Sequence, residues 1–540
     1  MSSGMRLLGK FMGFLVLFAV VLPGDRVFAA NLATGGTPAR QATLLVPYTQ
    51  YEWWLMRWSD SRLMCQLYTD HDGWPLGQDI FASCGNDVYT QWKSTAACPE
   101  AEQGNVSSCL GLYLLLIGSQ PAEKEILVDL PLMQVWVTLL GCEPTSPENF
   151  CSQIPSLLLT AEEPLPNEHI TAVHAMLSGQ TIDCLEGTCQ IPLQVTPLQG
   201  VTIEFWADSS FGDSSQHYVA KVRVVDTGVA DSPTESGWYV DVLSTQWRGA
   251  QIASCAQTWR VLPPVGGPPS WLSTPEVPSL LATDTAYFYL AGRLISQGLV
   301  DVSGCETGGL LQNGYADICG LEKAQPLVQE WQNRFDARIT EVALETGVPS
   351  QLMKNLFALE SQFWPGAFKD PKEFGLGQLT ENGAETVLLW NPNFYNQFCP
   401  LVLEASTCQK GYLSLDDDQR ATLRGALALQ AKADCEDCPA GIDLANADFN
   451  IKLFAETLLA NCEQVGQIVY NGTNHLAGEV STYEDLWRFT IANYHAGPGC
   501  LSYAIYNTWD SGNPMDWAHV KSYLTPACQG VIPYVERITK

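Results

Sequence analysis

Glu360 is the residue whose neighbours in the sequence best suit acid–base chemistry. It follows Leu352 and Leu356 at intervals of four, so the three share one face of a helix expected to begin near Pro349. A carboxyl on an apolar face loses hydration, which disfavours its charged form and raises its pKa. Such an acid can donate a proton near neutral pH. The alternative is a glutamate at a fraying helix end that turns toward solvent.

Three segments, in a fixed order along the chain, form a pattern with Glu360. They are Glu360-Ser-Gln-Phe-Trp-Pro365, Gly375-Leu-Gly-Gln-Leu379 and Tyr494-His-Ala-Gly-Pro-Gly499. Together they resemble the lytic transglycosylases, lysozyme-fold enzymes whose signatures run Glu-Ser, Gly-Leu-Met-Gln and Tyr-Asn-Ala-Gly. Asn450-Ile451 and Pro533-Tyr-Val-Glu-Arg-Ile538 match weaker features of that family. The resemblance covers about Gln325 to Lys540.

The resemblance implies a role for six residues, and it implies neither a cofactor nor a metal. Glu360 would be the catalytic acid and base. The residues that would line the sugar-binding cleft beside the scissile bond are Ser361, Gln378, Tyr494, His495 and Gly375. Structural alternatives exist for these positions: a helix cap, a hydrogen bond to backbone, a core ring and a tight turn.

Two positions depart from the family pattern. Gly377 stands where the family usually has Met, which removes a large side chain from the floor of the cleft. His495 replaces Asn, so a titratable ring takes the place of an amide. Tyr494 and His495 are expected on the last turn of a helix, where the helix dipole favours a cationic imidazole.

The expected mechanism depends on whether a second carboxylate lies near Glu360. Most glycosidases use two, about 5 Å apart for retention of configuration or roughly 6.5–9.5 Å apart for inversion. The resemblance implies one: Glu360 protonates the bridging oxygen of the MurNAc-GlcNAc β-1,4 bond, then deprotonates the 6-hydroxyl of the muramic sugar. That oxygen closes on C1 and leaves a 1,6-anhydro-muramoyl end. Asp370 and Glu373 could instead hold a water for lysozyme-like hydrolysis.

A second class of function is a surface protein that binds glycan without cleaving it. The expected partner in either case is a peptidoglycan glycan strand. An acid retained on an apolar stripe next to Ser361 favours the enzyme, because binding alone does not need a proton donor.

The elements that position these residues are expected to form several domains. Residues 30–165 are predicted to be β-rich and 166–235 β-sandwich-like, so the N-terminal region is all-β. Within it, 218–225 alternates in the manner of an edge strand. Residues 236–324 read as a Pro/Gly-rich linker and helical lead-in, and 325–540 as a mainly α, lysozyme-like catalytic domain.

The first 29 residues have the pattern of a signal peptide. Arg6 and Lys10 precede an apolar run over 11–22, and cleavage is expected after Ala29. The run is shorter than the roughly 20 residues that a membrane-spanning helix needs. No later stretch is long and apolar enough to span, so the expected location is secreted or extracytoplasmic.

Charge and cysteine content are consistent with that location. The net charge of −30 argues against nucleic acid as a partner. An even count of 18 cysteines in an exported chain points to disulfides. The expected close pairs are Cys142/Cys151, Cys184/Cys189, Cys305/Cys319, Cys399/Cys408 and Cys500/Cys528, and a structural role is favoured for Cys435 and Cys438 over a zinc or redox site.

Overall fold

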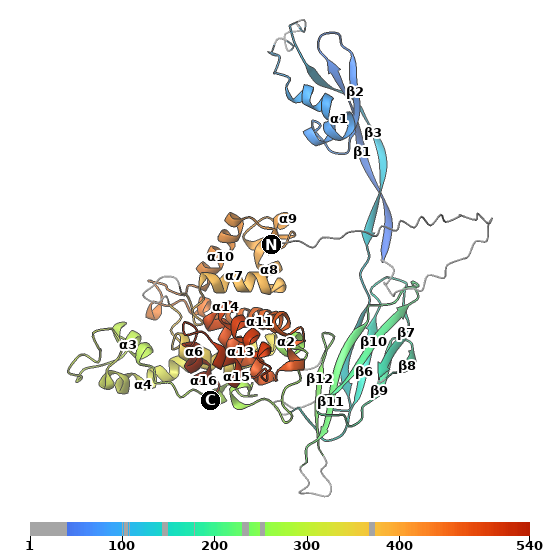
Figure 1. Cartoon of the computed structure of the whole chain (residues 1–540). Helices are drawn as coiled ribbons and strands as arrows, with labels where there is room; N and C mark the ends of the chain where they lie inside the picture. The colour runs from blue at the N-terminus through green and yellow to red at the C-terminus, as the bar shows by residue number, and fades with distance from the viewer. Residues whose placement is uncertain are drawn as a thin grey trace, which may run out of the picture.

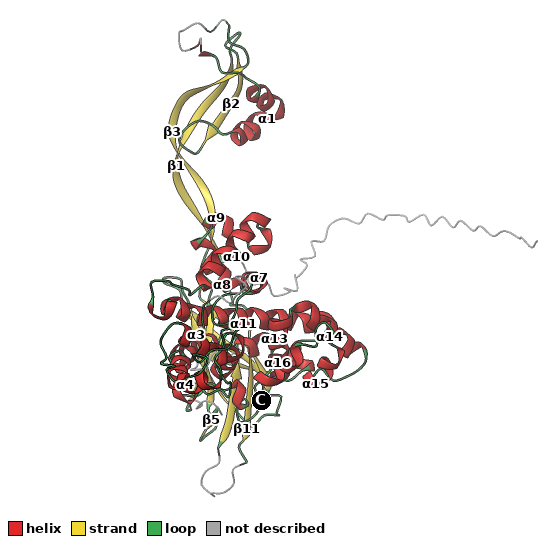
Figure 2. Ribbon diagram, turned by 90° about the vertical axis from the view of Figure 1, so that its left-hand side faces the viewer, coloured by secondary structure: helices red, strands yellow, loops and turns green. Residues whose placement is uncertain are grey.

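The computed structural model describes residues 40–99, 101, 106, 108–142, 149–177, 179–228, 237–248, 254–366 and 373–540. Three parts follow one another along the chain: a long two-stranded ribbon with a small head, a β-sandwich, and a mainly helical part (Figure 1, Figure 2). The sheets of the first two parts are antiparallel, as the sequence predicts. The expected signal peptide, residues 1–29, lies outside the described residues.

The ribbon is formed by β1 (Gln41–Arg57) and β3 (Leu112–Asp129), which pair along their whole length. Near its far end, β2 (Leu63–Thr69) adds to β1 and α1 (Gly77–Lys93) packs on β2, which makes the head. A two-stranded ribbon alone has almost no core. The head supplies a small one, closed by two disulfides, and its buried members are Trp53, Leu55, Leu67, Ile80 and Leu112.

A buried ion-pair cluster fixes the base of the ribbon to the sandwich. The Arg40 guanidinium lies 2.5 Å from a Glu163 oxygen and 2.8 Å from an Asp213 oxygen, and all three side chains are buried. Removing one partner from such a group leaves an uncompensated buried charge, which is strongly destabilising. The ribbon is therefore joined to the sandwich by charge as well as by chain.

The sandwich consists of two antiparallel sheets. Alternate residues such as Ile203, Phe205 and Ala207 point inward and are fully buried, as the two-residue period of a strand requires. The small sheet has the order β4 (Gln134–Leu140), β6 (Ser156–Glu162), β9 (Thr188–Pro192), and the large sheet has the order β5 (Phe150–Cys151), β12 (Trp238–Leu243), β11 (Tyr218–Asp226), β10 (Val201–Ser209), β7 (Ile170–Leu177), β8 (Gln180–Leu185).

The strand pairing joins segments that the sequence analysis assigned to different regions. β6 precedes the expected division at 165/166 and β9 follows it, yet the two pair through Thr160 and Thr188. β12 lies within the expected linker, 236–324, and pairs with β11. Their inward residues share one hydrophobic core, so a single sandwich spans β4 to β12.

The prediction of an edge strand over 218–225 is wrong, because β11 has β10 on one side and β12 on the other. The charged residues of 218–225 are Lys221 and Arg223, and Arg223 is buried. Its guanidinium lies 2.6 Å from Asp241 of β12, and both side chains are buried. Neutralisation by the neighbouring strand makes a charge acceptable in the middle of this sheet.

The helical part is built around α11, which contacts α2, α5, α7, α13 and α14 (Figure 1). Within the described ranges, no helix combines the length and apolarity that crossing a bilayer requires. The helices are α2 (Ser254–Trp259), α3 (Phe288–Ser296), α4 (Ile318–Asn333), α5 (Asp336–Thr346), α6 (Ser350–Glu360), α7 (Glu381–Trp390), α8 (Pro392–Phe398), α9 (Ala405–Cys408), α10 (Asp417–Ala431), α11 (Leu444–Thr473), α12 (Ala477–Val480), α13 (Tyr483–Ala496), α14 (Pro498–Asp510), α15 (Trp517–Val520) and α16 (Val531–Ile538).

The apolar period over 327–342 predicts one helix that stops at Gly347. The structure instead breaks the segment into α4 and α5. Asp336 begins α5 and is buried, where its carboxylate lies 2.5 Å from the buried Lys354 ammonium of α6. The break brings Asp336 and Lys354 together. Gly347 ends α5, as predicted, with the left-handed φ of 72° that is typical of a glycine after a helix.

The 18 cysteines form nine disulfides, and the five predicted close pairs are all among them. Cys435 and Cys438 bond to each other, as the favoured structural role requires. The longest connection is Cys255–Cys462, which joins α2 to α11 across 207 residues. This bridge links the chain just after the sandwich to the centre of the helical part.

Breaking Cys255–Cys462 is expected to destabilise the protein far more than breaking Cys435–Cys438. A bridge acts mainly by restricting the unfolded chain, and the sequence separations are 207 and 3 residues. We expect the double serine variant of the long bridge to lose about 4–5 kcal/mol of unfolding free energy. Calorimetric melting of both double variants measures the difference, and equal losses would contradict the expectation.

Candidate active site

Helix α6 places Glu360 at its C-terminal end, directly above buried apolar turns. Leu352 and Leu356, four residues apart on the same face, have no exposed surface. The predicted helix and its apolar stripe are therefore confirmed. Because the preceding turns are fixed in the core, the end of the helix has a defined position in the fold.

The chain after Glu360 is held by hydrogen bonds to neighbouring helices. Gln362 and Phe363 adopt left-handed φ values of 50° and 62°, so the chain turns sharply away from α6. The indole N–H of Trp331 donates to the Phe363 carbonyl at 2.9 Å, and the Gln362 side chain accepts from the Tyr289 N–H at 2.8 Å. This turn and the helix before it fix Glu360 from both sides.

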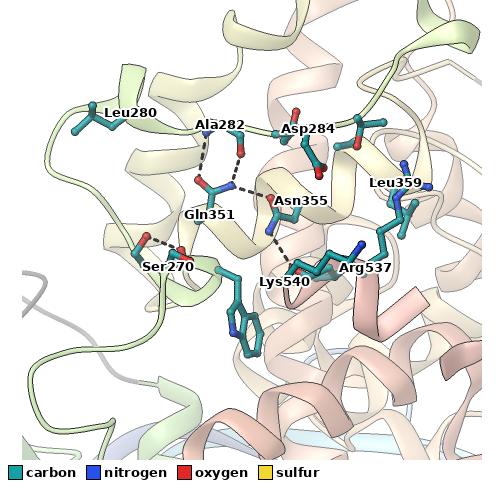
Figure 3. A pocket seen from close by; sticks show the side chains of 15 residues that line it. Ser270, Leu280, Ala282, Asp284, Gln351, Asn355, Leu359, Arg537 and Lys540 are labelled. Carbon is teal, nitrogen blue, oxygen red and sulfur yellow. Dashed lines mark hydrogen bonds between the residues drawn. The ribbon is translucent and has the colours of Figure 1, made fainter. Parts of the chain in front are cut away.

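On its outer face α6 is tied to two other segments around a hollow of about 500 Å³ (Figure 3). The Gln351 side chain donates to the carbonyl and accepts from the N–H of Ala282, at 2.6 and 3.3 Å. The Asn355 amide donates to the Ile538 carbonyl of α16 at 3.1 Å. The Asn355 bond fixes α6 against α16, the helix that contacts Glu360, and the Gln351 bonds fix α6 against the segment at Ala282.

The Glu360 carboxylate has one direct polar partner among the described residues: the Tyr534 hydroxyl of α16 donates to its Oε1. The pKa of Glu360 is raised to about 7: burial raises it most, the Tyr534 hydrogen bond lowers it, and the charge of the nearby Glu373 raises it. Desolvation outweighs the hydrogen bond. At neutral pH this group exists in both protonated and ionised forms.

His495 lies at the end of α13 and stacks on Tyr534, with ring centroids 3.9 Å apart and planes inclined by 15°. Its place on the last turn of a helix is as predicted. The expectation of a cationic ring favoured by the helix dipole is not met, because burial lowers the pKa of His495. The desolvation cost exceeds the attraction of the helix end, and the neutral ring acts as a wall behind Tyr534.

The segment Gly375-Leu-Gly-Gln-Leu379 forms a tight turn closed by two hydrogen bonds between Phe374 and Leu379. Gly375 has a φ of 74°, and a Cβ there would lie 1.9 Å from the Asn450 side chain of α11. Both the conformation and the space require glycine. Gly375 thus has the tight-turn role that was the structural alternative to a place in the cleft, and Asn450 of α11 packs against the turn.

Phe454 explains the departure at Gly377. A Cβ at Gly377 would lie 2.1 Å from the Phe454 ring, so the phenyl group of α11 occupies the space that a side chain at position 377 would need. The Tyr494 ring meets Phe454 edge to face at 5.4 Å, and its hydroxyl donates to the Gly377 carbonyl. The apolar floor is present, but it is supplied from another helix.

Gln378 is buried in the turn, and only the nitrogen of its side-chain amide forms a hydrogen bond with the described residues. Its Nε2 donates to the Gly375 carbonyl at 2.7 Å, which is the backbone bond named as the structural alternative to sugar binding. Its Oε1 is buried and receives no hydrogen bond from the described part of the chain. An unpaired buried acceptor is costly, so this oxygen is suited to a donor from a ligand.

Ser361 differs from the other expected cleft residues. It has no exposed surface, and its hydroxyl donates to the Phe357 carbonyl of its own helix at 3.3 Å. These are the contacts of the structural alternative, a residue that completes the end of α6. The structure thus places Tyr494 and Tyr534 next to Glu360, and Tyr494 also contacts the turn that contains Gln378, whereas the Ser361 hydroxyl bonds to its own helix.

The nearest described second carboxylate is Glu373, which is exposed at the start of the turn. It lies close enough to raise the pKa values of both Glu360 and Tyr494. Asp370, the other residue considered for this role, lies outside the described residues. No group of three or more potential metal ligands occurs within the described ranges.

Comparison of the chain with family models, curated proteins and solved structures finds no match in any of the three. The chemistry of the site is therefore argued from its own geometry.

Two residues of the site were not singled out individually by the sequence analysis. Tyr534 was noted only within a weak motif, and nothing in the sequence indicates that it reaches Glu360, 174 residues earlier. Phe454 lies four residues after Asn450, so both project from the same face of α11 toward the turn. That spacing is a signal that could have placed Phe454 near Gly377.

Glu360→Gln is expected to change how stability depends on pH. The unfolded carboxyl ionises near pH 4.5 and the folded one near pH 7. Between these values the folded state holds a proton that the unfolded state lacks. The free energy of unfolding of the wild type therefore falls as pH rises from about 4.5 through 7 and is constant above that range. The variant does not titrate and should gain up to about 3 kcal/mol relative to wild type between pH 5 and pH 8.

Urea unfolding at pH 5 and pH 8 measures this difference. Glu322→Gln, at an exposed position of α4, is the matched control and should follow the wild type. Parallel stability curves for wild type and Glu360→Gln would contradict a desolvated Glu360.

Gly377→Ala is expected to destabilise the protein in a way that Phe454→Ala relieves. The added methyl would overlap the Phe454 ring, so its cost depends on that ring being present. The double-mutant cycle should give a coupling of at least about 1 kcal/mol. Gly425→Ala on α10, where no atom lies within 4 Å of the new Cβ, is the control for the glycine-to-alanine change. Additive effects at 377 and 454 would show that the two sites are independent.

Proposed function

We propose that this protein is an exported enzyme that cleaves peptidoglycan glycan strands as a lytic transglycosylase. The observation that carries the proposal is the Glu360 carboxyl, buried at the end of α6 with a pKa raised to about 7. A general acid is most effective when its pKa lies near the working pH. The motif order around Glu360 supports the choice of substrate class.

The proposed reaction uses the two protonation states of Glu360 in turn. The protonated carboxyl gives its proton to the bridging oxygen, and the bond from that oxygen to C1 of MurNAc breaks. The resulting carboxylate takes the proton of the 6-hydroxyl, whose oxygen bonds to C1. The proton returns to Glu360, no water is consumed, and the product carries a 1,6-anhydro end.

Tyr534 fits the first of these steps. Its hydroxyl donates to Oε1 of Glu360, and a donor at this position favours the ionised carboxyl. The ionised form is the one present after the proton has left for the bridging oxygen. Tyr534 therefore stabilises the state that follows bond cleavage, while burial keeps the starting acid protonated.

Binding of an uncharged sugar is consistent with the rest of the site. The free Oε1 of Gln378 can accept a hydrogen bond from a sugar hydroxyl or an N-acetyl N–H. A protein with a net charge of −30 has no electrostatic attraction for an acidic wall polymer. Recognition would depend on such hydrogen bonds and on shape.

A hydrolytic, lysozyme-like reaction is the second candidate, and Glu373 is the observation that favours it. Glu373 is near enough to Glu360 to raise its pKa, so it could hold a water on the opposite side of the bond. A protein that only binds glycan is less consistent with this site. A desolvated acid costs stability, and an amide such as Gln could bind a sugar hydroxyl without that cost.

Export is supported by the cysteine chemistry together with the N-terminal pattern. Nine disulfides and no free thiol are typical of proteins that mature in an oxidising compartment. The signal-peptide pattern of residues 1–29 indicates the same route. Both observations suit an enzyme whose substrate lies outside the cytoplasm.

Digestion of purified peptidoglycan tests the function and the mechanism together. We expect soluble fragments that end in 1,6-anhydro-muramic acid and are lighter by one water than hydrolytic fragments, as read by mass spectrometry. Glu360→Gln should fold and lose cleavage by several orders of magnitude, because the amide has no proton to transfer. Glu322→Gln should cleave like the wild type.

Fragments of full hydrolytic mass would instead assign the water-dependent reaction. Wild-type activity in Glu360→Gln would remove this residue from the mechanism. Glycan that sediments with the folded wild-type protein but is never cut would support the binding alternative.

A further inference from the structure

A second pocket, of about 510 Å³, lies between the sandwich and the helical part. One wall is formed by β10, β11 and the segment after β12, and the other by α2 and α12. Its size is within the range of pockets that bind small molecules or short peptides. The residues used below are Lys221, Gln246, Arg260, His217 and Glu479.

The two walls of this junction pocket are fixed to each other. The Gln257 amide of α2 donates to the Ser244 carbonyl at 2.5 Å, which joins the helical wall to the sandwich wall. The indole N–H of Trp259 donates to the Cys462 carbonyl at 3.0 Å, beside the disulfide to α11. A Cβ at Gly478 would lie 2.6 Å from the Trp259 carbonyl, so α12 packs closely against α2. The pocket is thus preformed.

Gln246 contributes a buried acceptor without a partner. Its side chain lines the pocket and the residue is only 9 % exposed, yet Oε1 receives no hydrogen bond from the described chain. A buried acceptor without a hydrogen bond lowers the free energy of unfolding of the unliganded protein. An N–H or O–H donor on a ligand would satisfy it.

Two basic residues, Lys221 and Arg260, line the same pocket and have no carboxylate partner among the described residues. Lys221 is half-buried, and its ammonium makes a 3.4 Å hydrogen bond to the Arg260 carbonyl. Neither Lys221 nor Arg260 forms an ion pair with a described carboxylate, although the net charge is −30. Burial and the nearby Arg223 lower the pKa of Lys221, whereas Glu479 raises it. The unpaired cations are suited to an anionic group.

The remaining charged groups at the pocket are already engaged. The His217 ring lies 2.7 Å from a Glu204 oxygen, and the Arg223 guanidinium pairs with Asp241. Glu479 accepts from the Leu476 N–H at 3.0 Å and lies 3.6 Å from the His475 ring. By contrast, the hollow beside α6 has its buried amides paired with backbone, so it has no comparable free acceptor.

We propose that the junction pocket binds the carboxyl terminus of a short peptide. The terminal carboxylate would pair with Lys221 and Arg260, and a peptide N–H within a residue of it would donate to Gln246. A fully ionised oxyanion such as sulfate has no donor for that amide oxygen, and a neutral sugar has no negative charge to pair with the two cations. The inference does not depend on cleavage at Glu360. Peptides that cross-link wall glycans and the C-termini of proteins share this chemistry.

Isothermal titration of the whole exported protein with Ala-Ala-Ala tests the proposal. We expect binding of the acid and at least tenfold weaker binding of its C-terminal amide, because the charge-assisted contacts are lost. Lys221→Met and Gln246→Leu should each weaken binding of the peptide acid by about tenfold or more. Lys323→Met, on the exposed face of α4, is the matched control and should bind normally.

Melting temperatures separate binding from folding. Gln246→Leu should melt at the same or a higher temperature than wild type without peptide, because an unpaired buried acceptor is removed. Equal binding of acid and amide, or binding of inorganic phosphate but no peptide, would overturn the proposal. Glu360→Gln should bind the peptide as the wild type does, so loss of cleavage and loss of this site are distinguishable.

D-Ala-D-Ala and L-Ala-L-Ala distinguish the two sources of peptide. Binding of either dipeptide supports the site. Tighter binding of D-Ala-D-Ala would identify wall peptide as the source, and tighter binding of L-Ala-L-Ala would identify a protein C-terminus. Absence of binding by both dipeptides and the tripeptide would overturn it.

Discussion

The fold of the helical part depends on the burial of α11 on several sides. Its 30 residues include buried side chains from Ala447 to Thr473, and among the described helices it contacts α2, α5, α7, α10, α12, α13 and α14. A helix surrounded in this way acts as a core element, so the helices around it are positioned by packing and not by the loops that join them. It also contributes side chains to the site, because Asn450 and Phe454 pack against the turn at 375–379. Farther along α11, Asn461 and Gln464 accept hydrogen bonds from the buried Asn493 amide of α13.

This arrangement explains how an unfavourable group can be maintained at Glu360. Desolvating a carboxyl costs free energy, and the cost would be relieved if the end of α6 could move toward water. Movement is opposed by apolar turns on one side and by the bonds of Gln351 and Asn355 on the other. The surrounding packing thus holds an acid in a state that the isolated helix would not adopt. Perturbed groups of this kind concentrate at functional sites.

Much of this organisation could be predicted from local sequence. The strands of the first half, the helix that carries Glu360 and its apolar stripe, five close disulfides and the glycine that ends α5 all follow from patterns within a few residues. What could not be predicted depends on contacts between distant segments. The contact of Tyr534 with Glu360, the Phe454 ring behind Gly377 and the position of β11 within its sheet are set by tertiary packing. The ionisation of His495 failed as a prediction for the same reason, since a local helix dipole was outweighed by burial from outside the helix.

The ribbon of β1 and β3 has an effect on how copies of this chain behave when they meet. Over 41–50 no described strand covers the outer edge of β1, and β3 has no described neighbour on its far side. Such edges present free backbone groups on which another extended chain can add, the first step of edge-to-edge aggregation. Pro47 and Pro121 lack a donor at these edges, and Glu123, Lys124 and Glu125 place a run of charges on β3. These residues disfavour growth of a continuous sheet, so a long, uncovered ribbon is compatible with a protein that remains dispersed at high concentration.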